Sequence, residues 1–290
     1  MAQLFKTVAL IGKYNSLEIG GALMKLAAHL QERGIEVVIA AQTADRIGLN
    51  GYRTSTLADL RTVADLAIVL GGDGTMLSIA RNMATASVPL VGINQGRLGF
   101  LTDVSVEIMR ETLDEILAGE YVSEERFLLN AEVYREGSRI TETTAFNDVV
   151  VSKGAAGRLI EIEVFIDGRF VYSQRSDGLV VATPTGSTAY ALSAGGPIIH
   201  PTLEAMVLVP ICPHTLSNRP IAVNSHAEVE ILVIRADDCS SHFDGQSRVS
   251  LVVGDKVMVR RSPHTVRLLH PKGHSYYDML REKLHWGEKL

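Results

Sequence analysis

The sequence of 290 residues has only two cysteines, one tryptophan and no excess of positive charge. Cys212 and Cys239 form no CxxC pair and no disulfide framework, which fits a reducing compartment. The net charge of −5 gives no bulk basic field of the kind that binds nucleic acid or an anionic membrane. No apolar run approaches the roughly 20 residues that span a bilayer, and the first residues show no signal-peptide pattern. We therefore expect a cytoplasmic protein with no nucleic-acid or membrane partner.

Several common site signatures are also missing. The sequence has no Walker A loop, and Gly12-Lys13-Tyr14-Asn15 after the first expected strand is not a GxGxxG motif. The nine histidines show no HExxH motif and no zinc-ligand set. We therefore assign no residue as a metal ligand, and an ordinary P-loop kinase or a dehydrogenase is not indicated.

The most informative segment that is present is Gly71-Gly72-Asp73-Gly74-Thr75. It lies between the aliphatic run 66–70, which reads as a buried strand, and residues 76–83, which read as a helix. The glycines let the backbone turn tightly, and the helix start favours a phosphate. Gly71, Gly72, Gly74 and Thr75 are thus a candidate phosphate-binding loop.

Asp73 sets this loop apart, because a carboxylate beside phosphates is repelled unless it shares a metal ion, takes up a proton or deprotonates a hydroxyl. Phosphoryl transfer to an alcohol would use such a group as a proton acceptor. The alternative is a tight turn with an incidental aspartate.

Strand-like and helix-like segments alternate up to about residue 120, which predicts an α/β domain (1–120) with a parallel, Rossmann-like sheet. From Tyr121 onward strand signals dominate, and Asp167-Gly168 is typical of a hairpin turn. The second expected domain (121–290) is β-rich and sandwich-like, with a C-terminal helix near 280–284 that could pack back on the first domain. Expected strands include 128–134, 140–151, 162–166, 170–172, 178–182, 227–234, 249–253 and 257–259.

Three further segments could carry chemistry. Residues 183–197 follow a strand, and one interpretation is a turn with a short helix that Ser187 or Thr188 caps. The other interpretation is a surface of small residues against which a flat ring lies, with Tyr190 stacked on a base. Gln174–Gly178 could be a solvated surface. Asn147 and Asp148 stand inside an apolar strand, where they either face water or line a cleft.

Taken together, these segments resemble those of bacterial NAD kinases. The resemblance rests on 71–75, Gly92-Ile93-Asn94 with 98–101, Asn147-Asp148, 174–178, 183–197 and Asp244-Gly245-Gln246. The glycine loop is shared with diacylglycerol-type lipid kinases and phosphofructokinases, whereas 183–197 is specific to NAD kinases. A lipid kinase of the diacylglycerol or sphingosine type is the alternative.

The resemblance implies two domains with NAD between them, and phosphorylation of the adenosine ribose 2′-hydroxyl by ATP to give NADP. It implies Asp73 as the proton acceptor. The dinucleotide contacts that it implies are Asp73, Gly74, Asn147, Asp148, Arg158, Arg175, Asp177, Thr188, Ala189, Tyr190, Ser193 and Gln246. It also implies Mg²⁺ or Mn²⁺, a homo-oligomer (dimer or tetramer) and a cytoplasmic location.

The sequence departs from the family pattern at two positions and matches one subgroup at a third. Asp148 stands where the family commonly has Glu, and Gln95 stands where many relatives carry a basic residue. Arg175 resembles the Gram-negative form of its motif, in which NAD is preferred over NADH.

Overall fold

The computed structural model describes residues 4–12, 19–48, 51–96, 98–155, 157–215 and 217–286. The chain forms two compact units. The first runs to Glu125 and resumes at Val266, and the second comprises Arg126–Thr265. The second domain expected from the sequence ran to residue 290, whereas the structure places the last segment in the first unit. The reason is pairing: Leu268 lies opposite Leu90 in a parallel ladder, and Leu269 is buried in the core of the first unit.

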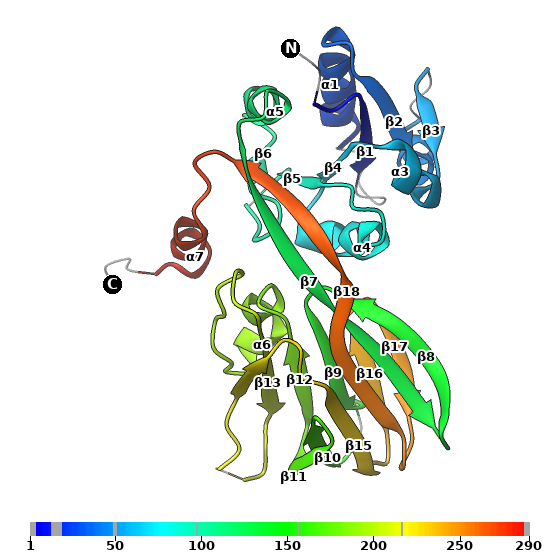
Figure 1. Ribbon diagram of the computed structural model, residues 1–290, viewed down its shortest axis with the longest axis vertical. Helices are drawn as coiled ribbons and strands as arrows, with labels where there is room; N and C mark the ends of the chain where they lie inside the picture. Colours follow the sequence, from blue (N-terminus) through cyan, green and yellow to red (C-terminus); the bar gives the residue numbers. More distant parts are fainter. Residues whose placement is uncertain are drawn as a thin grey trace. The chain divides into compact units, whose positions relative to one another are not determined.

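The first unit is an α/β domain with a parallel sheet in the order β3-β2-β1-β4-β5, which confirms the predicted class (Figure 1). Its strands are continuous aliphatic runs because parallel strands between helices are buried on both faces; every residue of β4 is buried. The elements are β1 (Thr7–Gly12), α1 (Ile19–Glu32), β2 (Glu36–Ala40), α2 (Ala41–Ile47), β3 (Arg53–Ser55), α3 (Leu57–Val63), β4 (Leu66–Leu70), α4 (Asp73–Met83), β5 (Leu90–Asn94), β6 (Val104–Ser105) and α5 (Met109–Leu117).

The C-terminal helix of this unit is α7 (Tyr276–Leu284), which starts four residues earlier than the helix expected at 280–284. Ser275 caps it by accepting the backbone N–H of Asp278 at 3.3 Å. Met279 and Leu280 are buried. The expectation that this helix belongs with the first domain agrees with its place in the first unit.

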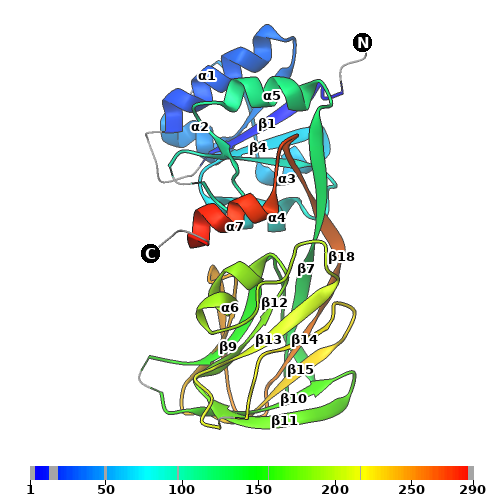
Figure 2. The ribbon, with the colours of Figure 1, turned by 90° about the vertical axis from the view of Figure 1, so that its left-hand side faces the viewer.

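The second unit is a sandwich of two antiparallel sheets, as predicted (Figure 2). One sheet has the order β11-β10-β15-β18 with β7 and β8, and the other has the order β14-β13-β12-β9-β16-β17. A single apolar core draws residues from both sheets, among them Val164 and Val181. The strands are β7 (Tyr121–Arg135), β8 (Ser138–Ala145), β9 (Asp148–Lys153), β10 (Ile160–Ile166), β11 (Arg169–Ser176), β12 (Gly178–Ala182), β13 (Ala205–Ile211), β14 (Ile221–Asn224), β15 (Val229–Arg235), β16 (Cys239–Phe243), β17 (Ser247–Leu251) and β18 (Lys256–Pro271).

The β10–β11 hairpin turns at Asp167-Gly168, as predicted. Both turn residues have positive φ, 51° and 72°. That pattern is the one that the right-handed twist of a two-residue hairpin requires, and it explains the choice of Asp-Gly.

Two local expectations are corrected. The single strand expected at 140–151 is two strands, β8 and β9, in different sheets. Ser187 and Thr188 do not cap the short helix α6 (Tyr190–Ser193), whose N-cap is Ala189. They lie in a preceding 3₁₀ turn (Gly186–Thr188), where the Ser187 hydroxyl donates to Pro184 O at 2.6 Å and accepts from the N–H of Ile199 at 2.9 Å.

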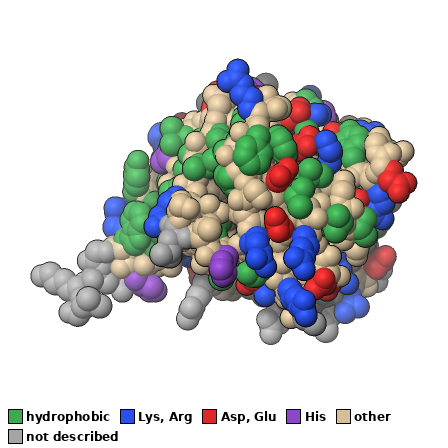
Figure 3. Space-filling model, turned by 90° about the horizontal axis from the view of Figure 1, so that it is seen from below, with side chains coloured by type: hydrophobic (Ala, Val, Ile, Leu, Met, Phe, Trp, Pro, Cys, Tyr) green, Lys and Arg blue, Asp and Glu red, His purple; other side chains and the backbone are tan. Residues whose placement is uncertain are grey.

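No helix among the described residues is both long and apolar enough to span a bilayer. The face seen from below in the space-filling view mixes basic, acidic and hydrophobic side chains (Figure 3).

Candidate active site

The glycine loop joins β4 to α4 as predicted, with Gly72 as the N-cap of the helix and Asp73 as its first residue. The backbone N–H groups of Thr75 and Met76 return to the carbonyl of Gly72. A Cβ on Gly71 would lie 2.7 Å from Thr75 Oγ1, whereas a Cβ on Gly72 or Gly74 would meet nothing within 4 Å. The outer side of the loop is therefore open to a ligand at the positive end of a helix.

Three donors hold the carboxylate of Asp73. Oδ2 accepts the N–H of Phe100 at 2.8 Å. Oδ1 accepts the N–H of Leu101 at 3.0 Å and the hydroxyl of Thr102 at 3.1 Å. A carboxylate offers about four acceptor positions, so three are occupied and about one is left for another group.

Two glycines let the segment 99–102 reach this carboxylate. A Cβ on Gly99 would overlap Asp73 Oδ1 and Thr102 Oγ1, and a Cβ on Gly92 of β5 would overlap the carbonyl oxygen of Leu101. Asn94 adds a hydrogen bond to Thr102 Oγ1 at 3.1 Å. Segment 99–102 is thus packed directly on β5 and fixes the direction of Asp73.

The second unit carries a cavity of about 370 Å³ along one face of β9. Polar groups of several kinds line it beside the aromatic ring of Tyr190, which is 46% exposed. Such a mixture of apolar surface and a few convergent polar groups is typical of a small-molecule site. The lining residues are Asn147, Asp148, Val150, Ser152, Ala189, Tyr190, His242, Asp244 and Gly245.

Asp244 organises one wall of this cavity. Its Oδ1 accepts the N–H of Asn147 at 2.7 Å and that of Asp148 at 3.1 Å, and its Oδ2 accepts the N–H of Phe146 at 2.9 Å. These bonds replace the ladder bonds of a continuous strand and explain why β8 ends before β9 begins. The break turns Asn147 and Asp148 toward the cavity, so the reading in which both line a cleft is the one that the structure supports.

Asp148 is an unusual acid. Its residue is only 5% exposed, and burial together with the nearby charge of Asp244 raises its pKa to about 7. It therefore changes its charge close to neutral pH, as functional carboxyls often do. His242 faces the same cavity, and burial together with Arg248 lowers its pKa, which favours a neutral imidazole.

The start of segment 183–197 packs against the backbone of Phe146 and Asn147. The hydroxyl of Thr183 donates to the carbonyl of Phe146 at 2.7 Å, and its N–H donates to the carbonyl of Asn147 at 2.9 Å. A Cβ on Gly186 would overlap that same carbonyl of Asn147. The threonine and the glycine are thus needed to bring Ala189 and Tyr190 to the cavity.

Comparison with known proteins identifies the chain. The model of the ATP-NAD kinase N-terminal domain matches residues 8–121, and that of the ATP-NAD kinase C-terminal domain matches residues 146–271. The chain belongs to the NAD kinase family. A NAD kinase of Thiobacillus denitrificans is 58% identical over 286 residues, with 99% of each chain covered, and one of Chromobacterium violaceum is 56% identical over 290 residues, with 100% of each covered.

Two solved structures agree with this assignment. Yeast NADH kinase complexed with NADH has a TM-score of 0.90 at 25% identity, covering 100% of this chain and 90% of its own. An NAD kinase from Archaeoglobus fulgidus in complex with ATP has a TM-score of 0.76 at 25% identity, covering 95% and 98%. The matches favour an NAD kinase over the lipid-kinase alternative.

Of the residues that the NAD kinase resemblance predicts, the structure gathers Asn147, Asp148, Ala189 and Tyr190 around one cavity. Thr188 and Ser193 belong to the same segment but do not line it; the Thr188 hydroxyl donates to the carbonyl of Thr185 at 3.1 Å. Gln246 is exposed in the β16–β17 turn, two residues after Asp244. Asp73 and Gly74 lie in the glycine loop of the first unit.

The remaining predicted residues are not among those that line the cavity. Arg175 and Asp177 precede β12, whose first residue, Gly178, lies opposite Ser152 of the cavity wall in the ladder. Asp177 forms an ion pair with Lys153 at 2.8 Å. The side chain of Arg158 is 87% exposed and 4.0 Å from Asp237. These three residues are not brought to the cavity by this chain.

Sequence reasoning gave no role to Asp244, His242 or segment 99–102. The residues of Asp244-Gly245-Gln246 and of 98–101 were part of the family resemblance, but nothing local indicated their partners. No sequence pattern marks a glycine such as Gly99, which precedes a segment whose backbone N–H groups bind a carboxylate. Asp244-Gly245 is an Asp-Gly pair like the one at 167–168, and both of its residues have positive φ, 52° and 63°, but such a pair indicates a turn and not the bonds that the Asp244 carboxylate accepts.

Proposed function

We propose that the two units divide the NAD kinase reaction between them. The reaction is transfer of the γ-phosphoryl group of ATP to the 2′-hydroxyl of the adenosine ribose of NAD, which yields NADP and ADP. The cavity of the second unit binds the dinucleotide, and the glycine loop of the first unit binds donor phosphates. The observation that carries this assignment is Asp73, held by three donors at the start of α4 behind an open glycine loop.

Asp73 accepts the proton of the 2′-hydroxyl as the oxygen–phosphorus bond forms. In the same step the bond between the γ-phosphorus and the bridging oxygen of ADP breaks, and ADP leaves with its electron pair. The clamp by residues 100–102 leaves about one acceptor position on Asp73 for that hydroxyl. Because the donors are backbone groups and one short side chain, the carboxylate keeps its direction without loss of side-chain entropy during the reaction.

A divalent cation, Mg²⁺ or Mn²⁺, fits the donor set. Mg²⁺ usually keeps several waters and binds substrate phosphates, and the glycine loop beside Asp73 is open to phosphate. Such an ion would neutralise charge on the transferring phosphoryl group. Because the open position of Asp73 is assigned to the 2′-hydroxyl, the donor phosphates and water would supply most of the ligands of the ion.

The cavity supplies recognition of the acceptor. The amide of Asn147 and the carboxyl of Asp148 are placed to bond hydroxyl or amide groups, and the exposed ring of Tyr190 offers a face for a base to stack on. Asp148 is one methylene shorter than the Glu usual in the family, so its bond to the ligand is longer or passes through water. Arg175 supports a preference for NAD over NADH by its resemblance to the Gram-negative motif.

A homo-oligomer, dimer or tetramer, and a cytoplasmic location complete the proposal. Arg158 and Arg175 are exposed and do not line the cavity of their own chain. In an oligomer they would be available to a dinucleotide bound by a second copy. Analytical ultracentrifugation with and without NAD tests the oligomer.

The activity is tested by incubating the full chain with ATP, MgCl₂ and either NAD or diacylglycerol. We expect NADP, detected by an NADP-specific dehydrogenase, and no phosphatidate. Formation of phosphatidate alone would support the lipid-kinase alternative, and binding of NAD and ATP without turnover would overturn catalysis. A panel with NADH as acceptor tests the preference for the oxidised dinucleotide.

A further inference from the structure

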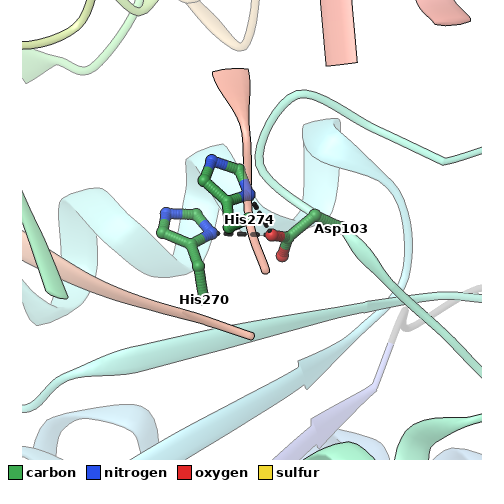
Figure 4. A group of neighbouring side chains, drawn as sticks. All are labelled: Asp103, His270 and His274. Carbon is green, nitrogen blue, oxygen red and sulfur yellow. Dashed lines mark hydrogen bonds and ion pairs between the residues drawn. The ribbon is translucent and has the colours of Figure 1, made fainter. Parts of the chain in front are cut away.

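Three buried polar side chains of the first unit meet next to the segment that holds Asp73 (Figure 4). Asp103 directly follows that segment, His270 lies near the end of β18, and His274 lies between β18 and α7. Their side chains are 4%, 2% and 7% exposed. Buried polar groups of this kind cost free energy that apolar side chains of similar size would not cost.

Asp103 accepts a hydrogen bond from each imidazole. Nδ1 of His270 and Nδ1 of His274 both lie 2.8 Å from the same oxygen, Oδ2 of Asp103, and Figure 4 shows both rings turned toward it. Burial raises the pKa of Asp103, but the hydrogen bonds from the two histidines outweigh it and lower that pKa to about 2. Because an ionised carboxylate only accepts hydrogen bonds, each Nδ1 carries a hydrogen. The rings stack with centroids 4.0 Å apart, so the two histidines hold this oxygen together.

The segment that carries the histidines is itself tied to the sheet of the first unit. Leu268 pairs with Leu90 of β5, and Leu269 is buried in the core. The N–H of His274 donates to the carbonyl of Pro271 at 2.9 Å, which closes the turn after β18. The histidines therefore extend from backbone that is joined to the same sheet as β4 and its glycine loop.

Thr102, the residue before Asp103, is part of the clamp on Asp73. Its hydroxyl accepts from the side-chain amide of Asn94 at 3.1 Å and donates to Oδ1 of Asp73 at 3.1 Å. A hydroxyl has one hydrogen, so the bond from Asn94 leaves that hydrogen for Asp73. A Cβ on Gly92 would lie 2.8 Å from the Cα of Thr102, so this backbone lies directly on β5. The clamp is thus held by β5 and, one residue further along the chain, by the bonds of Asp103.

We propose that Asp103 is a positioning residue for Asp73, and that the two histidines fix Asp103 in place. This inference rests on the proposed role of Asp73 as proton acceptor. Asp103 itself touches no reacting atom; it keeps the donors of the clamp at the places where they bond the carboxylate. Without its bonds the end of the clamp can shift, and a carboxylate that is displaced by part of an ångström is less often aligned with the 2′-hydroxyl.

His274→Ala tests the proposal, because it removes one of the two bonds to Asp103. The matched control is His29→Ala, since Nε2 of His29 lies 2.9 Å from Oδ1 of Asp114 in a bond that joins α1 to α5. Each variant loses one histidine–aspartate bond of the first unit, so both should lower Tm. Only His274→Ala should lower kcat for NADP formation, by about 10-fold, with the KM for NAD unchanged.

Conservative variants separate the hydrogen bonds from the bulk of the side chains. The side-chain amide nitrogen of asparagine is as many bonds from the backbone as Nδ1 of histidine, so His274→Asn can still donate to Asp103 and should restore most of kcat. Asp103→Asn keeps one oxygen that can accept from both rings and should also retain most of kcat. Asp103→Ala removes both bonds and should lower kcat by about 100-fold. Equal losses in the asparagine and alanine variants would contradict the proposal.

A second background shows whether the effect passes through Asp73. In Asp73→Asn the proton acceptor is absent, so adding His274→Ala should lower kcat no further. The same factor in both backgrounds would overturn the proposal, and so would an unchanged kcat for His274→Ala in the parent. If His274→Ala does not fold, His274→Leu replaces it in each comparison, because leucine keeps the bulk and donates no hydrogen bond. A parent chain that forms no NADP would instead show that the proposed function has failed, and the inference with it.

Discussion

Gly99 lies so close to Asp73 that a Cβ at position 99 would overlap Oδ1 of the carboxylate. The same glycine begins the segment whose N–H groups and hydroxyl hold that carboxylate. Gly99 has no side chain that could take part in the reaction, but it lies in contact with the proposed proton acceptor, Asp73.

The first prediction follows from this contact. Gly99→Ala should push the Asp73 carboxylate out of its clamp and lower kcat about 100-fold, because a misplacement of about 1 Å at a reacting group has effects of this size. NAD binding should be unchanged, since the cavity residues are in the second unit. Gly21→Ala, where a Cβ meets nothing within 4 Å, is the control. Steady-state kinetics with calorimetry of NAD binding measures both, and an unchanged kcat would remove the clamp from the mechanism.

Asp73→Asn tests the proton acceptor itself. The amide keeps the size of the side chain but accepts no proton, so kcat should fall by about 10²- to 10⁴-fold while NAD still binds. Its NH₂ group would also face a backbone N–H of the clamp, Phe100 or Leu101. Asp45→Asn on the exposed side of α2 is the matched control. Turnover near the parent level in single-turnover assays would end the general-base assignment.

Asn147→Ala tests the cavity of the second unit. Removal of the amide leaves a group of the bound dinucleotide unpaired, and apparent affinity for NAD should fall by about 1–3 kcal/mol. The fold should persist, because Asp244 bonds the backbone N–H of residue 147 and not its side chain. Asn130→Ala on β7 is the control. Unchanged affinity in isothermal titration would mean that this wall does not face the ligand.

The sequence predicts features whose residues are contiguous in the chain, and it does not predict contacts between residues that are far apart in the chain. The strand, loop and helix around Asp73 were predictable because the aliphatic run, the glycines and the following helix are contiguous. The clamp on Asp73 was not, because its donors are 27 or more residues away and two of them are backbone N–H groups, which every residue except proline has.

The same reason explains the misread strand at 140–151. Its period and composition favour one continuous strand, but the carboxylate of Asp244, 97 residues from Asn147, takes the backbone N–H groups at the break. The bonds of His270 and His274 to Asp103 (Figure 4) were not predicted either, because Asp103 is more than 160 residues from both and meets them only through the fold.

The pKa of Asp148 predicts how the free energy of unfolding depends on pH. Burial and the charge of Asp244 raise its folded-state pKa to about 7, above the ordinary value of 3.8 for an aspartate. The folded chain therefore binds more protons than the unfolded chain between these values, and the free energy of unfolding falls as pH rises. The stabilising contribution of protonated Asp148 is fully present below about pH 4 and is lost as pH rises through about 7. The slope that this one group adds is at most about 1.4 kcal/mol per pH unit.

Asp148→Asn should remove that slope. The parent and the variant should differ least near pH 5, and the variant should gain relative stability up to pH 8, because its amide never takes a charge beside Asp244. Urea unfolding at pH 5, 6, 7 and 8 measures the difference, with Asp45→Asn as the exposed control. A difference between parent and variant that is flat across this range would mean that Asp148 is ionised throughout. The pair of carboxylates would then have to share a cation or a donor in place of a proton.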